Sequence, residues 1–147
     1  MRNIKKLPLA VLVWLRMARL TARMNQQSNE FLQQDGLTAA QFEVLVLIER
    51  YQPISQQQLA EQLTVTQGGI SRLLQRMQQA GLIEKKAYGK EKHIFLSALG
   101  QEKLSQVYDK QITNQAQMFD SLSKDELQTL FQLLTKLSQE KIDRSDE

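Results

Sequence analysis

The chain has 147 residues, which suits one compact domain per subunit and is too short for two ordinary domains. Its 41% hydrophobic and 24% charged residues are typical of a globular protein, and the absence of cysteine excludes disulfides, thiolate metal sites and thiol-based redox sensing. His93 is the single histidine, so we expect neither a metal site nor a cofactor. The net charge of +3 is unevenly placed, because residues 1–24 hold six basic and no acidic residues, and residues 66–96 hold six basic against two acidic ones. Such basic clusters are compatible with a polyanionic partner.

The first predicted element is a long helix from about Pro8 to Gly36. Proline suits the first turn of a helix, and glycine suits the left-handed position that ends one. The apolar run at residues 7–15 is shorter than the roughly 20 residues that span a bilayer, and arginines follow it at once. We therefore expect this segment to be a helix that does not contact a membrane, and the protein to be cytoplasmic. Its apolar stripe comprises Leu9, Leu12, Val13, Met17, Leu20, Met24 and Phe31.

Further helix starts share a capping pattern, in which a Ser or Thr is followed three residues later by Gln or Glu and is flanked by apolar residues. The complete pairs are Thr38 with Gln41, Ser55 with Gln58, and Ser123 with Glu126. Thr66 and Ser97 are two more candidate caps. Pro53 predicts the end of the second helix, and Gly81 predicts the end of the fourth.

Between Gly81 and Ser97 the helical pattern gives way to two short strands, at residues 82–88 and 92–96, which predict a β-hairpin. Gly89, Lys90 and Glu91 lie between the strands. A helix follows from Ala98 to about Asp120, and a last helix has leucines and one phenylalanine at spacings of three and four residues.

Residues 55–80 have the spacing of a helix-turn-helix, with a short helix, a turn at residues 64–66 and a second helix. Ala60 is small enough for the two helices to approach closely. The other predicted core positions are Leu59, Leu63, Ile70, Leu73, Leu74 and Met77.

With that stripe in the core, the outward face of the second helix is polar and its charges are all basic. It comprises Gly68, Arg72, Gln75 and Gln79, flanked by Ser71 and Arg76. Arginine can read guanine and glutamine can read adenine, so this chemistry suits a DNA major groove. The backbone at Gly68 and Gly69 can approach a phosphate. A merely solvated helix face is the alternative for this pattern taken alone.

The hairpin that follows favours the DNA interpretation, because a basic hairpin directly after a helix-turn-helix makes a winged helix. Its lysines, Lys85, Lys86, Lys90 and Lys92, can neutralise phosphates beside the groove that the helix occupies. His93 is expected on a wing strand, near DNA or solvent.

Residues 37–100 resemble the MarR family (multiple antibiotic resistance regulators) of bacterial transcription factors. The matching runs, in order, are LTAAQF at 37–42, LAEQL at 59–63, ISRLL at 70–74, GLIEK at 81–85 and LSALG at 96–100. The flanking long helices also match the family in number and placement. The resemblance implies an obligate homodimer with intertwined terminal helices, a pseudo-palindromic operator, and a small-ligand pocket between the dimerisation region and the lobe.

One departure from the family lies in the wing. The family's wing holds an Asp-x-Arg element whose arginine enters the minor groove, whereas this chain has YGKEK at residues 88–92 and a shorter wing. We expect Lys90 to make the contact at the tip, with Lys92 second, and we expect these contacts to be with phosphate.

The predicted fold is a single, mainly α domain over residues 1–147. Residues 37–97 form the winged helix-turn-helix lobe with its small β-hairpin, and residues 1–36 and 98–147 form dimerisation helices. The apolar run near Trp14 covers more than one helix face, which a partner subunit can bury. The candidate interface residues are Leu9, Leu12, Val13, Trp14, Leu130, Phe131, Leu134 and Leu137. Met17 and Met24 are expected mainly in core or interface, and are secondary candidates for the ligand pocket.

The sequence therefore predicts a sequence-specific regulator, a homodimeric repressor that binds double-stranded DNA and that a small effector releases. The candidate DNA-binding residues are Ser55, Gln56, Thr66, Gln67, Gly68, Gly69, Ser71, Arg72, Gln75, Arg76, Lys85, Lys86, Lys90 and Lys92. An enzyme is not expected, since no nucleophile–base set and no phosphate-binding glycine loop is visible. The alternative is a winged helix that binds a protein instead of DNA. Salt distinguishes the two, because DNA binding should weaken steeply as salt concentration rises and protein binding much less.

Overall fold

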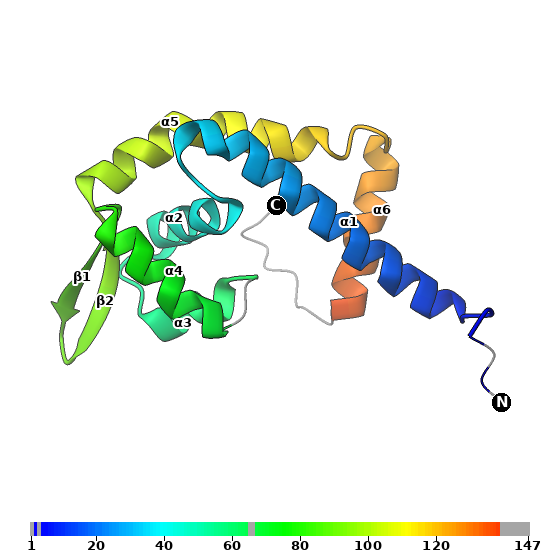
Figure 1. Ribbon diagram of the computed structural model, residues 1–147, viewed down its shortest axis with the longest axis horizontal. Helices are drawn as coiled ribbons and strands as arrows, with labels where there is room; N and C mark the ends of the chain where they lie inside the picture. The colour runs from blue at the N-terminus through cyan, green and yellow to red at the C-terminus, as the bar shows by residue number, and fades with distance from the viewer. Residues whose placement is uncertain (1, 3, 65–66, 139–147) are drawn as a thin grey trace.

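The computed structural model describes residues 2, 4–64 and 67–138, with only the backbone described at residues 67 and 68. The elements run in the order α1 (Leu9–Leu32), the 3-10 turn η1 (Gln33–Asp35), α2 (Ala39–Tyr51), α3 (Gln56–Gln62), α4 (Gln67–Gln79), β1 (Ile83–Tyr88), β2 (Glu91–Leu96), α5 (Ala98–Gln117) and α6 (Lys124–Ser138). This is the predicted mainly α architecture with a single antiparallel hairpin (Figure 1).

The predicted helix boundaries are confirmed at most caps. The hydroxyls of Thr38, Ser55 and Ser123 each accept a hydrogen bond from the backbone N–H three residues further on. The side-chain oxygen of the glutamine or glutamate at that position in turn accepts the backbone N–H of the capping residue. Gly36 and Gly81 have φ of 72° and 76°, the left-handed values that suit glycine. The candidate cap Thr66 lies outside the described residues.

Two boundaries differ slightly from the sequence prediction. Pro8 is the residue before α1 and not in its first turn, and its carbonyl accepts from the N–H groups of Val11 and Leu12. The hairpin turn is two residues long, because Glu91 is paired with Tyr88 and belongs to β2. Gly89, with φ of 64°, provides the positive φ that two-residue hairpin turns require.

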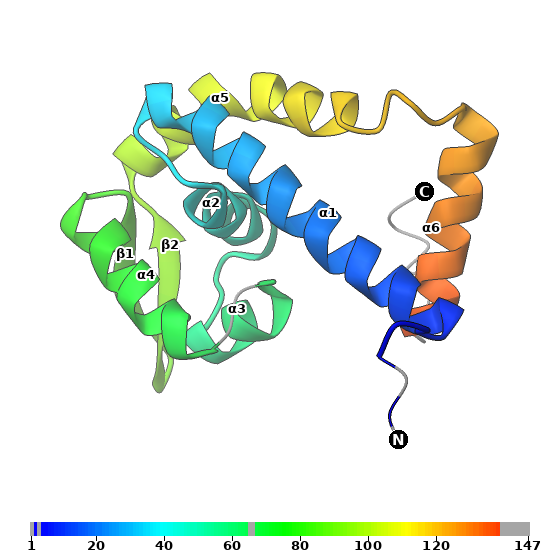
Figure 2. The same ribbon diagram turned by 45° about the vertical axis from the view of Figure 1, so that its right-hand side comes forward.

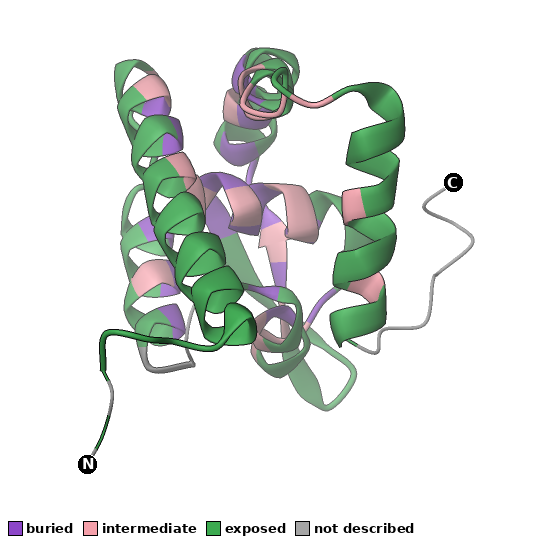
Figure 3. Cartoon of the chain, turned by 90° about the vertical axis from the view of Figure 1, so that its right-hand side faces the viewer, coloured by how far each residue is buried: buried purple, intermediate pink, exposed green. Residues whose placement is uncertain are grey.

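The hydrophobic core lies in the lobe formed by α2, α3, α4, the hairpin and the first half of α5 (Figure 3). Each fully buried leucine or isoleucine contributes about 1.5–3 kcal/mol relative to an exposed one. The fully buried members of this core include Leu45, Ile48, Leu59, Ile70, Leu74, Met77 and Ile94.

Most of α1 and all of α6 lie outside this core. Figures 1 and 2 show α1 leaving the lobe diagonally, while α6 follows the far end of α5, away from α4 and the hairpin. The only buried residues of α1 are Ser28 and Leu32, near its C-terminal end, and α6 has none. Within the described part of the chain, no helix combines the length and apolar character that crossing a membrane requires.

The junction between α4, the hairpin and α5 is tightly packed. Ser97 caps α5 by accepting from the N–H of Gly100, and its hydroxyl also donates to the carbonyl of Gly81. Gly100 lies so close to β1 that a Cβ atom there would be 2.0 Å from the carbonyl oxygen of Leu82. The start of α5 is thereby joined to the start of the hairpin.

We predict that Gly100→Ala destabilises the protein. Alanine in a helix interior stabilises by about 1 kcal/mol relative to glycine, and by less in a first turn, where Gly100 lies. Moving backbone to admit the Cβ costs about 1–3 kcal/mol, so the free energy of unfolding should fall. Chemical denaturation of the variant and the parent measures the difference. An unchanged or raised free energy of unfolding would contradict the close approach.

Candidate nucleic-acid interface

The exposed face of α4 is the one that the sequence predicts. Ile70, Leu74 and Met77 are buried on the opposite side, with 1% or less of their surface exposed. The residues on the outward side are Ser71, Arg72, Gln75, Arg76 and Gln79, and all are exposed. Gly69 is also exposed in the first turn, whereas Thr66 and the side chains of residues 67 and 68 lie outside the described part.

The start of α3 contacts this face directly. The Gln56 amide donates a hydrogen bond of 3.1 Å to the hydroxyl of Ser71, which joins the first turn of α3 to the outward side of α4. Ser55 is half-buried, and its hydroxyl accepts the capping bond from the N–H of Gln58. Of these two candidates for DNA contact, Gln56 is therefore the one that lies against the polar face.

The four lysines of the hairpin are all exposed, but they are divided between its two faces. Residues directly opposite each other across the ladder share a face. Lys85 is opposite Ile94, and Lys92 is opposite Ala87, so both lie on the face that carries the buried base of the hairpin. Lys90 lies in the turn.

Lys86 lies on the other face of the hairpin. Its ammonium is 3.1 Å from the carboxylate of Glu84 and 5.8 Å from the centre of the Phe95 ring. His93, on the same face, is half-buried, and its ring contacts Tyr88 edge-on at 5.1 Å. The hairpin thus presents its lysines unequally, as the alternation of side chains along a strand requires for the neighbours Lys85 and Lys86.

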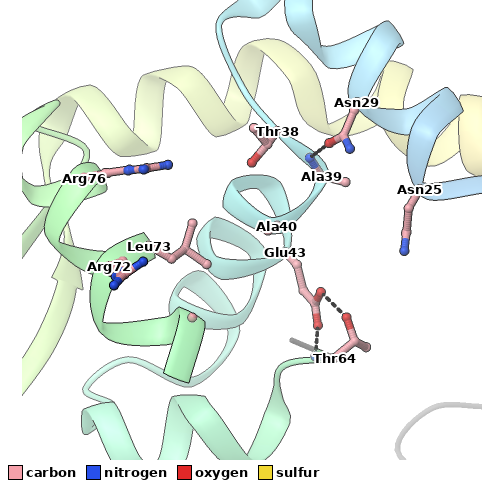
Figure 4. Close-up of a pocket in the computed structure, with 11 residues that line it drawn as sticks. Asn25, Asn29, Thr38, Ala39, Ala40, Glu43, Thr64, Arg72, Leu73 and Arg76 are labelled. Atoms are coloured by element: carbon pink, nitrogen blue, oxygen red, sulfur yellow. Dashed lines mark hydrogen bonds between the residues drawn. The ribbon is translucent and has the colours of Figure 1, made fainter. Parts of the chain in front are cut away.

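A pocket of about 550 Å³ lies between α1, α2, the end of α3 and α4 (Figure 4). Arg72 and Arg76 belong to its wall and also to the exposed face of α4 beside Gln75 and Gln79. The other lining residues are Asn25, Asn29, Thr38, Ala39, Ala40, Glu43, Thr64, Gly69 and Leu73.

Sequence reasoning missed several polar residues of this pocket, because they lie on four segments that only the tertiary structure brings together. Asn25 and Asn29, at positions i and i+4 and so on one face of α1, were the available signal. The secondary ligand candidates are placed elsewhere. Met17 lines a groove against α6, and neither Met17 nor Met24 is in the wall of the α1–α4 pocket.

The terminal helices expose an apolar surface of unusual extent. Exposed fractions reach 76% at Leu9, 65% at Trp14, 60% at Phe131 and 68% at Leu137. Leu12, Val13 and Leu134 are exposed as well, and Leu130 is half-buried. Large contiguous apolar patches of this kind mark interaction sites on proteins.

The comparisons with known proteins agree with this architecture. A family model described as the MarR family matches residues 35–90. An uncharacterized HTH-type transcriptional regulator of Bacillus cereus is 46% identical over 127 residues, which is 86% of each chain, and a counterpart from Bacillus anthracis matches equally well.

Solved structures of MarR from E. coli are similar over most of the chain. A mutant MarR complexed with operator DNA has 25% identity and a TM-score of 0.80, covering 87% of this chain and 94% of that one. The oxidized form of MarR has 27% identity and a TM-score of 0.72, covering 90% and 95%. From the family match, the extent of its similarity to the Bacillus regulators and its winged helix, this chain belongs to the MarR family of helix-turn-helix transcriptional regulators.

Proposed function

We propose that the protein is a homodimeric, sequence-specific DNA-binding repressor whose α4 enters the major groove of a pseudo-palindromic operator. The observation that carries this proposal is the exposed face of α4, where Arg72, Gln75 and Arg76 stand opposite a fully apolar core side. Arginine and glutamine are the side chains that read guanine and adenine. A relative of the same fold, MarR from E. coli, was solved with operator DNA. Because the target is chromosomal DNA, we propose that the protein acts in the cytoplasm.

The exposed apolar surface of α1 and α6 supports the dimer. A single lobe has no means of covering Leu9, Trp14, Phe131 and Leu137, whereas the same helices of a second copy would bury them. A dimer would also present two α4 helices, which matches the two half-sites of a palindromic operator.

The pocket between α1 and α4 supports regulation by a small effector. The guanidinium groups of Arg72 and Arg76 favour a carboxylate or another small anion. Since both arginines also belong to the exposed face of α4, an effector that binds them would compete with DNA for the same side chains.

The experiment that tests the function is selection of binding sites from a random duplex pool, with the size of the bound oligomer measured in the same preparation. A palindromic consensus bound by a dimer supports the proposal. Salt-sensitive binding without a consensus would indicate a non-specific DNA binder. Absence of binding at low salt would favour the alternative, a winged helix that binds a protein.

Arg72→Ala should reduce affinity for the selected operator by about 1–3 kcal/mol and relax the preference at one base position in each half-site, because its guanidinium is assigned to a base edge. Titration of duplexes that vary at each position measures both effects. Lys124→Ala, at the start of α6, is the control for loss of one positive charge. Unchanged affinity and preference in Arg72→Ala would mean that α4 docks differently.

Lys90→Ala should weaken binding to all sequences alike, because a lysine at the tip of the wing contacts phosphate and not bases. The slope of log affinity against log salt concentration should become shallower by about 0.9 for each phosphate that the variant no longer neutralises. Affinities of the parent and the variant are measured across a salt series on operator and random duplexes. A weakening confined to one base position would instead indicate insertion into a groove.

Trp14→Glu should convert the dimer to monomers, because the substitution introduces a charge into an apolar interface without a partner. Light scattering during size-exclusion chromatography over a range of concentrations measures the oligomeric state. Leu99→Glu, an exposed apolar position on the lobe, is the matched control and should leave the dimer intact. A Trp14→Glu variant as dimeric as the parent would contradict the assigned interface.

A further inference from the structure

The carboxylate of Glu43, on α2, binds Thr64, which lies between the two helices of the helix-turn-helix. One oxygen accepts the backbone N–H of Thr64 at 2.9 Å, and the other accepts the hydroxyl of Thr64 at 2.8 Å (Figure 4). Both oxygens of the carboxylate are thus engaged by a single residue. Bonds to an ionised acceptor are among the stronger hydrogen bonds of proteins.

Thr64 is placed where a small displacement changes the position of α4. It directly follows Leu63, the C-cap residue of α3, and α4 begins at Gln67. The core contacts of α4 are made by Ile70, Leu74 and Met77, and apolar contacts have little directional preference. A two-point bond from α2 to Thr64 is directional, so it restrains the position of Thr64 relative to the lobe.

The same carboxylate lies in the wall of the pocket with Arg72 and Arg76. Any occupant of the pocket therefore meets both the arginines that also face outward and the group that holds the turn. Substitutions that break the bonds from Thr64 leave the side chains of the outward face of α4 themselves unaltered.

We propose that Glu43 is a positioning residue for the recognition helix, and that it links the state of the pocket to the DNA-binding face through Thr64. This inference rests on the proposed function. The physical expectation is that breaking the bonds lowers the population of the binding-competent arrangement, which weakens apparent affinity in proportion.

Hydrogen exchange of the DNA-free protein tests the link itself, independently of DNA. The Thr64 amide should exchange at least about tenfold faster in Glu43→Ala than in the parent, because its acceptor is removed. Glu49→Ala, which removes the same charge from the exposed side of α2, should leave that rate unchanged. An amide of Thr64 that exchanges freely in the parent, or equally in both variants, would overturn the proposal.

Affinity for the selected operator tests the positioning role. Removing a negative charge near DNA should strengthen binding to a polyanion, so a simple charge effect makes Glu43→Ala and Glu49→Ala both bind more tightly. Loss of positioning predicts the opposite sign for Glu43→Ala alone, a Kd raised about tenfold. Stoichiometric titration gives the active fraction, which separates this effect from partial unfolding. Tighter or unchanged binding by Glu43→Ala would overturn the proposal.

Substitutions at Thr64 complete the test. Thr64→Ser keeps both donors and should bind within about twofold of the parent, whereas Thr64→Val lacks the hydroxyl and should bind more weakly. Glu43→Ala combined with Thr64→Val should weaken binding by less than the product of the two single effects, because the two residues share the bonds. A multiplicative effect would overturn the link.

If the parent binds no DNA, the proposed function fails and the DNA-binding role of Glu43 falls with it. The exchange rates of the Thr64 amide still decide whether Glu43 holds Thr64.

Discussion

The burial of one side of α4 against the lobe is the constraint on which the rest of the interface depends. Ile70, Leu74 and Met77 lie on one stripe of the helix and are almost entirely removed from water. Because a helix turns by a fixed angle per residue, burying this stripe decides the direction of every other side chain on it. Arg72, Gln75 and Arg76 are exposed as a consequence and not through any contact of their own.

The two halves of the chain satisfy the hydrophobic effect in different ways. The lobe buries its apolar residues within one chain, while the stem of α1 and α6 leaves large apolar side chains in contact with water. The stem is joined to the lobe by polar contacts as well. Asp35 follows α1, and its carboxylate is 2.8 Å from the ammonium of Lys110 on α5. The backbone carbonyl of Asp35 accepts a hydrogen bond of 3.0 Å from the ammonium of Lys103. In the dimer that we propose, a rearrangement of the stem would therefore reach the lobe through α5 and the end of α1.

The pocket lies where stem and lobe meet, and its residues have more than one role. Asn29, on α1, accepts the N–H of Ala39 at the start of α2, so the stem contributes a bond to the first helix of the lobe. Glu43 bonds the turn before α4, and the arginines of α4 close the opposite wall. MarR from E. coli has been solved in an oxidized form, but this chain has no cysteine, so an input to this pocket cannot be thiol oxidation.

The sequence by itself determined the order and type of the elements, most of the caps and the outward face of α4. These depend on local rules, namely helix capping, the left-handed φ of Gly36 and Gly81, and the periodicity of apolar residues, which act within a few neighbouring positions. The tertiary structure alone decided that the pocket wall contains Glu43 and Thr64 and excludes Met17 and Met24. Such contacts join side chains from segments that are separate in the chain, and their geometry follows from how the helices pack and not from the spacing of residues.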